Sequence, residues 1–203
     1  MYRTLGGTVL IAAMLSPFTV HAFEIKERPK VYLAAEYGQG SGSEIIEIED
    51  YRWKGDTDVD HKRLTLGFLS HSDNRFEISY VQQDLGFESP LDDETLSGFS
   101  LDGVITVTDY RVRPFIRLGL GYMTYEGTGD YIEGDHDLNG FAFNFGAGLL
   151  FEVLPQLELD IGYHDTTLYW EDLFYTDEEG TEYKEQAENN HGVVAAAVRF
   201  IFR

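Results

Sequence analysis

The connections between eight short alternating segments of this chain run long, short, long, short, long, short, long. The segments, each predicted to be a β-strand, are Val31–Gly38, Lys62–His71, Arg75–Asp84, Gly98–Val107, Arg111–Tyr125, Gly140–Glu152, Leu157–Trp170 and His191–Phe202. The short connections are His71–Arg75, Thr108–Tyr110 and Val153–Gln156, and the long ones are Gln39–His61, Leu85–Ser97, Glu126–Asn139 and Glu171–Asn190. A sheet that grows by hairpins, with all long loops at one end, indicates an all-β, eight-stranded antiparallel up-and-down barrel.

The first part of the chain has the pattern of an export signal. Arg3 is followed by a mostly apolar stretch, Leu5–Val20, and Val20-His21-Ala22 matches the small-x-small cleavage pattern. Glycine, serine and proline interrupt the stretch, so it makes a poor membrane span, and an uncleaved anchor is the alternative. We therefore expect residues 1–22 to be a cleaved signal peptide and residues 23–203 to form the barrel domain.

Charge and cysteine content limit the compartments in which the protein can reside and the partners that it can bind. The chain has no cysteine, which fits an exported protein that relies on its sheet and not on disulfides. Without Arg3, the remaining 14 Lys and Arg against 36 Asp and Glu give a net charge of −22. Nucleic acid is excluded as a partner, because phosphate binding needs clustered Lys and Arg. The acid is concentrated in the long connections, above all in Glu171–Asn190.

The two faces of the predicted strands differ in side-chain size, and this difference indicates a membrane. Successive side chains point to opposite faces. In Gly140–Glu152, one row is Phe141, Phe143, Phe145, Ala147, Leu149 and Phe151, and the other is Ala142, Asn144, Gly146, Gly148, Leu150 and Glu152. The small row is rich in glycine: Gly67, Gly119, Gly121, Gly146, Gly148 and Gly162. Such a row cannot fill a protein core but can line a narrow barrel, so we expect the bulky row to face hydrocarbon. The predicted fold is therefore a transmembrane β-barrel.

Aromatic residues collect near the strand ends, where their amphipathic rings suit the lipid–water interfaces. The residues expected in these girdles are Tyr37, Tyr110, Phe115, Tyr122, Tyr125, Phe151, Tyr163, Tyr169, Trp170, Phe200 and Phe202.

Three pieces of the chain resemble the eight-stranded outer-membrane β-barrel superfamily, of the OmpA-like and OmpX-like kind. They are the export signal, the stretch Pro114–Tyr122 and the C-terminal strand. The resemblance implies the outer membrane of a Gram-negative bacterium, with no peptidoglycan-binding domain. It also implies an assembly signal at Val198, Phe200 and Phe202, recognised by the barrel-insertion machinery. Outer-membrane lipid and lipopolysaccharide would be the surroundings, the barrel would be a monomer, and no cofactor is expected.

The inward rows carry charge that needs partners in a confined, low-dielectric space. The expected interior polar network is Glu36, Arg63, Glu77, Asp102, Arg117, Asn144, Glu158, Asp160, His164 and Arg199. Three arginines would face a larger set of carboxylates. One interpretation is a ladder that fills and rigidifies the barrel. The other is a gate, in which Arg117 or Arg199 exchanges carboxylate partners and opens a thin water path.

Catalytic and metal motifs are weak. His164 and Asp160 share one face of a strand, but no serine lies beside them, so no catalytic residue is predicted. Asp135, Asp137 and Asn139 match the opening of a calcium loop, yet position twelve is Gly146 and not the required Glu, which leaves weak candidates only.

The first long connection contains an alternating stretch, Ile45–Tyr51, which is predicted to protrude as a hairpin or to pack on other loops. The sequence thus predicts an outer-membrane barrel with a structural or surface-interaction role through four acidic extracellular loops, able to meet an extracellular ligand or surface. The alternatives are a narrow, porin-like pore for small solutes or ions and, third, a lipid A-modifying enzyme.

Overall fold

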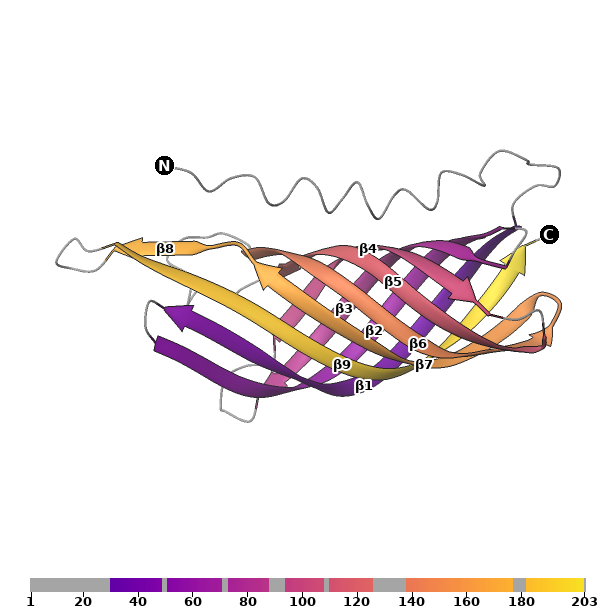
Figure 1. The fold of residues 1–203 in the computed structure, drawn as a ribbon, viewed down its shortest axis with the longest axis horizontal. Coiled ribbons are helices and arrows are strands. Elements are labelled where there is room, and N and C mark those ends of the chain that lie inside the picture. The colour runs from indigo at the N-terminus through magenta and orange to yellow at the C-terminus, as the bar shows by residue number, and fades with distance from the viewer. Residues whose placement is uncertain are drawn as a thin grey trace.

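The strands of the sheet run the length of the molecule as long, tilted ribbons that close on themselves (Figure 1). The computed structural model describes residues 30–48, 51–70, 73–87, 94–107, 110–125, 138–176 and 182–202. The signal-peptide prediction for residues 1–22 lies outside this part. The strands are β1 (Lys30–Ile48), β2 (Tyr51–Leu69), β3 (Arg75–Phe87), β4 (Glu94–Thr106), β5 (Val112–Tyr125), β6 (Leu138–Leu154), β7 (Leu157–Trp170), β8 (Leu173–Thr176) and β9 (Glu182–Phe202). No helix among the described residues is long and apolar enough to cross a membrane.

From β1 to β7 each strand pairs antiparallel with the next, β7 pairs with β9, and the ring closes because β1 also pairs with β9. The closure runs from Val31↔Phe202 to Ile48↔Glu185. The eight strands of the ring are β1 to β7 and β9, which confirms the predicted fold class. The short β8 pairs only with the start of β9 and stands outside the ring.

The two ends of the barrel differ. The connections β2–β3, β4–β5 and β6–β7 lie at one end, together with Lys30 and Phe202, and we call this the turn end. Asp73, in the β2–β3 turn, has a φ of 56°, a left-handed conformation that aspartate tolerates in turns. The opposite end, to which the longer connections belong, is the loop end.

Two predicted loops are wrong, because most of their residues belong to strands. Gln39–His61 continues β1 and β2 up to the pair Ile48↔Tyr51, and Glu171–Asn190 contains β8 and the first half of β9. These strands were not predicted because their sequences are rich in serine, glycine and acidic residues. Outside a membrane both faces of a sheet can be polar, so the bulky–small contrast used to find strands is lost there. The protruding hairpin predicted around Ile45–Tyr51 is confirmed.

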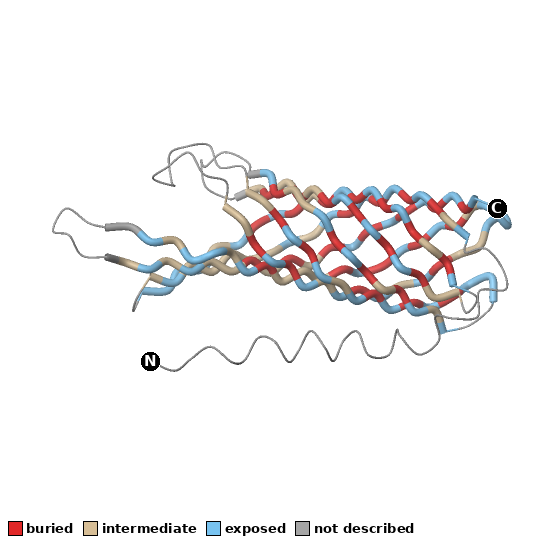
Figure 2. Tube along the Cα trace, turned by 90° about the horizontal axis from the view of Figure 1, so that it is seen from above, coloured by how far each residue is buried: buried red, intermediate tan, exposed pale blue. Residues whose placement is uncertain are grey.

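Burial alternates residue by residue along the barrel strands, as Figure 2 shows. Outward side chains such as Phe141 and Leu64 are 67% and 63% exposed, whereas the inward Leu150 is fully buried. The predicted rows of β6 and β9 are therefore confirmed: the bulky row faces out and the small row faces in.

The interior is apolar near both ends. At the loop end, Val59, Val81, Leu85, Leu96, Met123, Ala142, Leu168, Val193 and Ala195 form one buried cluster, which we call the loop-end layer. Two smaller clusters lie toward the turn end: Tyr32, Ala34, Leu69 and Ile201, and Val104, Phe115 and Leu150. Most buried charged residues lie between these apolar clusters, and Arg75, Arg113 and Glu158 lie beside the apolar clusters of the turn end.

Candidate functional site

The interior brings the predicted polar residues together from opposite walls of the barrel. Nine of them are buried: Glu36, Arg63, Glu77, Asp102, Arg117, Glu158, Asp160, His164 and Arg199. The tenth, Asn144, is half-buried, and its Oδ1 accepts a hydrogen bond of 3.0 Å from Thr166. Alternation places all ten inside because each follows the inward parity of its strand.

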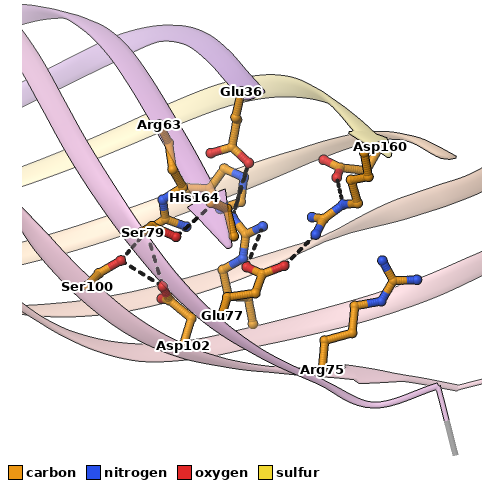
Figure 3. A network of polar contacts seen from close by, with 12 residues as sticks. Glu36, Arg63, Arg75, Glu77, Ser79, Ser100, Asp102, Asp160 and His164 are labelled. Carbon is orange, nitrogen blue, oxygen red and sulfur yellow. Dashed lines mark hydrogen bonds and ion pairs between the residues drawn. The ribbon is translucent and has the colours of Figure 1, made fainter. Parts of the chain in front are cut away.

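Glu77 on β3 is the centre of the network (Figure 3). Its carboxylate accepts short hydrogen bonds from the Tyr32 hydroxyl and from Arg199, and its Oε2 lies 3.2 Å from Nη2 of Arg117. Arg199 also donates through Nε to Asp160 at 2.6 Å. The Glu77 carboxylate therefore connects β3 directly with β1, β5 and β9, and Arg199 extends the network to β7 through Asp160.

Glu36 on β1 forms a second node. Nη1 of Arg117 lies 3.2 Å from its Oε2, and Nε2 of His61 lies 3.2 Å from its Oε1. Nε2 of His164 lies 3.6 Å from Oε2 of Glu36. Toward the loop end, Gln83 bridges two rings, with Nδ1 of His191 at 3.1 Å and Nδ1 of His61 at 3.4 Å.

Asp102 on β4 contacts side chains from its own strand and from β2. It accepts a hydrogen bond of 2.7 Å from the Ser100 hydroxyl and faces Nη2 of Arg63 at 3.5 Å. The same Arg63 nitrogen donates to Ser100 at 3.1 Å. This group fills the β2–β4 side of the lumen.

A further cluster lies at the turn end. Glu158 on β7 accepts from Arg75 at 2.7 Å and makes a short ion pair with Arg113. Arg113 also contacts Asp73 at 3.1 Å. Because Arg75 is on β3 and Glu158 on β7, this pair spans the barrel.

The interior charges balance. Arg63, Arg75, Arg113, Arg117 and Arg199 are buried with Glu36, Glu77, Asp102, Glu158 and Asp160. The prediction of three arginines against a larger set of carboxylates is therefore wrong, because the buried residues in the described ranges include five arginines and five carboxylates. A neutral set with mutual contacts avoids the cost of an isolated buried ion, which is several kcal/mol.

Sequence reasoning missed Arg75, Arg113, His61, His191 and Tyr32. Arg75 and Arg113 lie at or near the start of predicted strands and have the inward parity of those strands, but they were not included in the predicted network. His61 was assigned to a loop that is part of β2. Applying the alternation to every residue of the predicted strands would have found Tyr32, Arg75, Arg113 and His191, and continuing it past Lys62 would have found His61.

Three members of the predicted aromatic girdles point inward instead. Phe115 is 2% exposed and packs where Gly148 and Gly162 leave room. Tyr125 and Trp170 pack against the loop-end layer and contact each other edge to face. Strand-end position alone did not separate the lipid-facing row from the inward row.

The candidate catalytic pair and metal motif gain no support from geometry. Asp160 is bound by Arg199, and His164 faces Arg117 and Glu36, so the two are not each other's partners. Asp135 and Asp137 lie outside the described residues, and Asn139 is bound by Thr124 and Glu171. Within the described ranges, no three His, Asp or Glu residues form a group that could hold a metal ion.

β1, β2 and β9 continue past the barrel at the loop end, on the left of Figure 1, and β8 pairs with the end of β9 there. We call this part the blade and define it as Ser43–Ile48 of β1, Tyr51–Asp56 of β2, β8, and Glu182–Ala187 of β9. The spatial order is β2-β1-β9-β8. Lys184 contacts Asp172 at 2.8 Å, and this hydrogen bond lowers the pKa of the Asp172 carboxyl. Tyr51, Trp53 and Phe174 in the blade are 64%, 39% and 62% exposed.

The comparisons with known proteins decide the family. The model of the outer membrane protein beta-barrel domain matches residues 10–200. The chain belongs to the outer membrane protein β-barrel family. Members of this family are outer-membrane proteins of Gram-negative bacteria, and this barrel is located there. No curated protein matches the sequence.

Solved structures of outer-membrane proteins are similar to this chain, and the first of them supports the same fold. Neisserial surface protein A (NspA) is 19% identical, with 87% of this chain and all of that chain covered at a TM-score of 0.52. Ail of Yersinia pestis is 17% identical, with 86% of this chain and 100% of that chain covered at 0.41. The N-terminal barrel of OprF from Pseudomonas aeruginosa is 14% identical, with 86% and 100% covered at 0.46.

Proposed function

We propose that this outer-membrane protein is a closed, non-enzymatic barrel that presents its blade as an interaction surface outside the cell. Outer-membrane barrels keep short turns in the periplasm and long connections outside. By that layout the turn end, with Lys30 and Phe202, is periplasmic, and the blade is extracellular. Lipopolysaccharide and outer-membrane lipid would then surround the outward rows of a single barrel.

The observation that carries the proposal is the continuation of β1, β2 and β9 beyond the barrel. Paired strand extends from Gly40↔Val59 to Ile48↔Tyr51, above the exposed outward residues Tyr37 of β1 and Leu64 of β2. A sheet of this length is not needed to close eight strands. Its exposed Tyr51, Trp53 and Phe174 are the residue types enriched at binding surfaces.

The interior favours this function over a pore. Eight strands enclose little more than their own side chains. Here the loop-end layer closes one end, with Leu85 and Leu96 each 1% exposed, and ion pairs such as Arg75–Glu158 cross the lumen below. A water path would require both to move.

The test compares the full chain with a variant that lacks the β1–β2 hairpin of the blade and keeps β8 and β9, which we call the blade-truncated variant. Residues 43–56 are replaced by an Asn-Gly turn, which suits the antiparallel pair Gly42↔Thr57. Bacteria displaying either protein are assayed for attachment to a coated surface and for cell–cell sedimentation. We expect the truncated variant to lose attachment while its barrel stays folded. Equal attachment by both variants would remove the support for an interaction role.

Two further measurements separate the alternatives. Single-channel recording in planar bilayers should show no steady conductance steps, and reproducible steps would favour the pore. Mass spectrometry of lipid A from cells with and without the protein should give identical profiles, and a new acylation state would favour an enzyme.

A further inference from the structure

The outward apolar band of the barrel is much shorter on one wall than on another. β2 and β3 each have three outward apolar residues, which are Leu64, Leu66 and Phe68 on β2 and Phe76, Ile78 and Tyr80 on β3. β5 has six, from Val112 to Tyr122, and β6 has the same number from Phe141 to Phe151. At a rise of about 3.3 Å per residue and a tilt of about 40°, the band is about 10 Å tall on β2 and β3 and about 25 Å tall on β5 and β6. Outer-membrane barrels have a band of about 25 Å, so the β2–β3 wall has less than half of it.

The strand register sets the relative heights of these bands on the tilted strands (Figure 1). A row of paired residues that starts at Phe202 on β9 climbs round the ring from β1 to β7 and returns to β9 at Gly192, ten residues nearer the loop end. Each step to the next strand therefore raises the row by about 3 Å, because one residue adds about 2.5 Å along the barrel axis.

The β2–β3 band is short at both of its ends. Leu64 shares a row with Tyr122, which lies three strands further round the ring and is therefore about 9 Å higher. Lys62, two residues above Leu64, is thus at about the same height as Leu120 on β5. At the turn end, the band of β3 stops at Phe76, the second residue of the strand, whereas the band of β5 continues to a level about 9 Å lower.

The polar groups above the short band form a charged rim. Nζ of Lys62 lies 2.7 Å from Oδ2 of Asp84, and the Tyr37 hydroxyl donates to Asp60 at 3.1 Å. A charged group on the lipid-facing side destabilises a barrel more strongly the deeper it lies in the bilayer. The hydrocarbon beside this wall therefore has to end below Lys62 and Asp60, although β5 presents Leu120 to the lipid at the height of Lys62.

The same wall is hollowed on its outer face. A groove of about 580 Å³ crosses β9, β1, β2, β3 and β4, and it is lined by Leu33, Ala34, Ala35, Leu64, Thr65, Leu66, Ile78, Ser79, Tyr80, Phe99, Val198 and Phe200. Ala35 is the smallest outward residue of this lining, and its partners on the neighbouring strands are Leu64 and Val198. Acyl chains in a thinned bilayer have to tilt or bend sideways, because their volume stays the same while the bilayer height falls. The groove offers apolar space to such chains.

The charge of the rim decides what covers the wall. A membrane protein with a short apolar stretch can thin the bilayer, extend flanking side chains to the interface, or oligomerise. Lys62 is already bound to Asp84 and has little freedom to extend. A second copy would bring Asp58, Asp60 and Asp84 of one rim near the same three carboxylates of the other, and like charges repel. Lipid is therefore the occupant that this wall favours.

We propose that the β2–β3 wall holds a locally thinned patch of the outer membrane, and that acyl chains of the lipid in this patch fill the groove around Ala35. The wall is then a lipid-binding surface that selects short acyl chains. This site is separate from the blade, and the inference does not depend on the proposed role of the blade.

The first experiment measures where the hydrocarbon ends on two walls. The chain has no cysteine, so one introduced cysteine can be labelled with a fluorophore in the full protein. Lys62→Cys and Leu120→Cys are compared in nanodiscs of dioleoyl phosphatidylcholine, with iodide as a water-soluble quencher; Asp60 and Asp84 keep the rim charged in the first variant. We expect iodide to quench the label on β2 at least about threefold more strongly than the label on β5. Equal quenching would show a flat membrane boundary and would overturn the proposal.

The second experiment identifies the lipid in the groove. Ala35→Cys on the short wall and Ala147→Cys on the tall wall are a matched pair, since both replace an outward alanine. Each labelled protein is placed in nanodiscs of mixed dilauroyl and dioleoyl phosphatidylcholine, with one of the two lipids brominated at a time so that it quenches the label. We expect the dilauroyl lipid to be enriched at least about twofold at Ala35 relative to Ala147. Equal lipid composition at the two positions would overturn the selection of short chains.

A second copy of this chain would give a different set of results. The label at Lys62→Cys would be protected from iodide, neither brominated lipid would quench the label at Ala35→Cys, and oxidation would cross-link Ala35→Cys between copies. This outcome would overturn the lipid patch in favour of a dimer interface. Heat-modifiable migration confirms that each variant is folded. The blade-truncated variant should give the same quenching as the full chain, so failure of this inference and failure of the proposed function are distinguishable.

Discussion

The carboxylate of Glu77 shows how much one residue can contribute in a narrow lumen. It is fully buried and contacts Tyr32, Arg117 and Arg199. Removing one partner of a buried ion pair is more damaging than the pair is stabilising, because the remaining charges lose their compensation. Without the Glu77 carboxylate, the buried guanidinium groups of Arg117 and Arg199 would each lose an ion-pair partner.

Glu77→Ala should therefore lower the free energy of unfolding by about 3–5 kcal/mol, measured by urea titration of the folded barrel in detergent. The control is Lys62→Ala, which breaks the exposed Lys62–Asp84 pair of 2.7 Å and should cost at most ~1 kcal/mol. Equal effects of the two substitutions would contradict a stabilising interior network.

Glycine has a steric role at Gly67, where a Cβ would fall on the Tyr32 ring. Gly67→Ala should destabilise the barrel by about 1–3 kcal/mol through overpacking. Gly121→Ala is the matched control, because the nearest atom to its Cβ, that of Ala142, would be 3.1 Å away. Combining Gly67→Ala with Tyr32→Ser should restore part of the loss, and a purely additive result in the double-mutant cycle would exclude this contact as the cause.

At the scale of elements, one strand serves two environments. The lower part of β1 alternates between lipid and lumen, whereas its upper part, Ser43–Ile48, is flanked by β2 and β9 outside the barrel. The barrel pairs below Gly42↔Thr57 do not depend on the hairpin above them. We therefore expect the barrel to fold without the hairpin of the blade.

The blade-truncated variant should keep heat-modifiable migration in SDS gels and a free energy of unfolding within about 1 kcal/mol of the full chain, since the change is confined to solvent-exposed strand. Parallel urea titrations of the two proteins provide the measurement. Loss of the folded band would show that the blade is part of the folding unit.

The C-terminal strand β9 carries the proposed assembly signal, Val198, Phe200 and Phe202. All three side chains face outward, and the two phenylalanine rings contact edge to face. We expect Phe202→Ala to slow insertion into liposomes only when the purified insertion machinery is present. Equal slowing without the machinery would assign Phe202 to barrel packing instead.

For the whole molecule, the closed interior and the solvent-exposed blade imply graded stability along the same strands. Local opening is easiest where few buried contacts cover the backbone. Amide hydrogen exchange should therefore be slow for Val31–Gly38 and faster for Ser41–Ile48 of β1, although both are hydrogen-bonded on two sides. Uniform protection along β1 would show that the blade is as rigid as the barrel.

The sequence alone determined the ring of eight strands, its antiparallel order and the membrane-facing row, because a membrane requires side chains of opposite character on the two faces of each strand. It also placed Glu36, Glu77, Arg117 and Arg199 on the inward parity. Only the tertiary structure decided which charges meet, because pairs such as Arg75–Glu158 join strands far apart in sequence. It also revealed the blade. There both faces of the sheet meet water, so the strands lack the contrast between bulky and small rows from which the barrel strands were predicted.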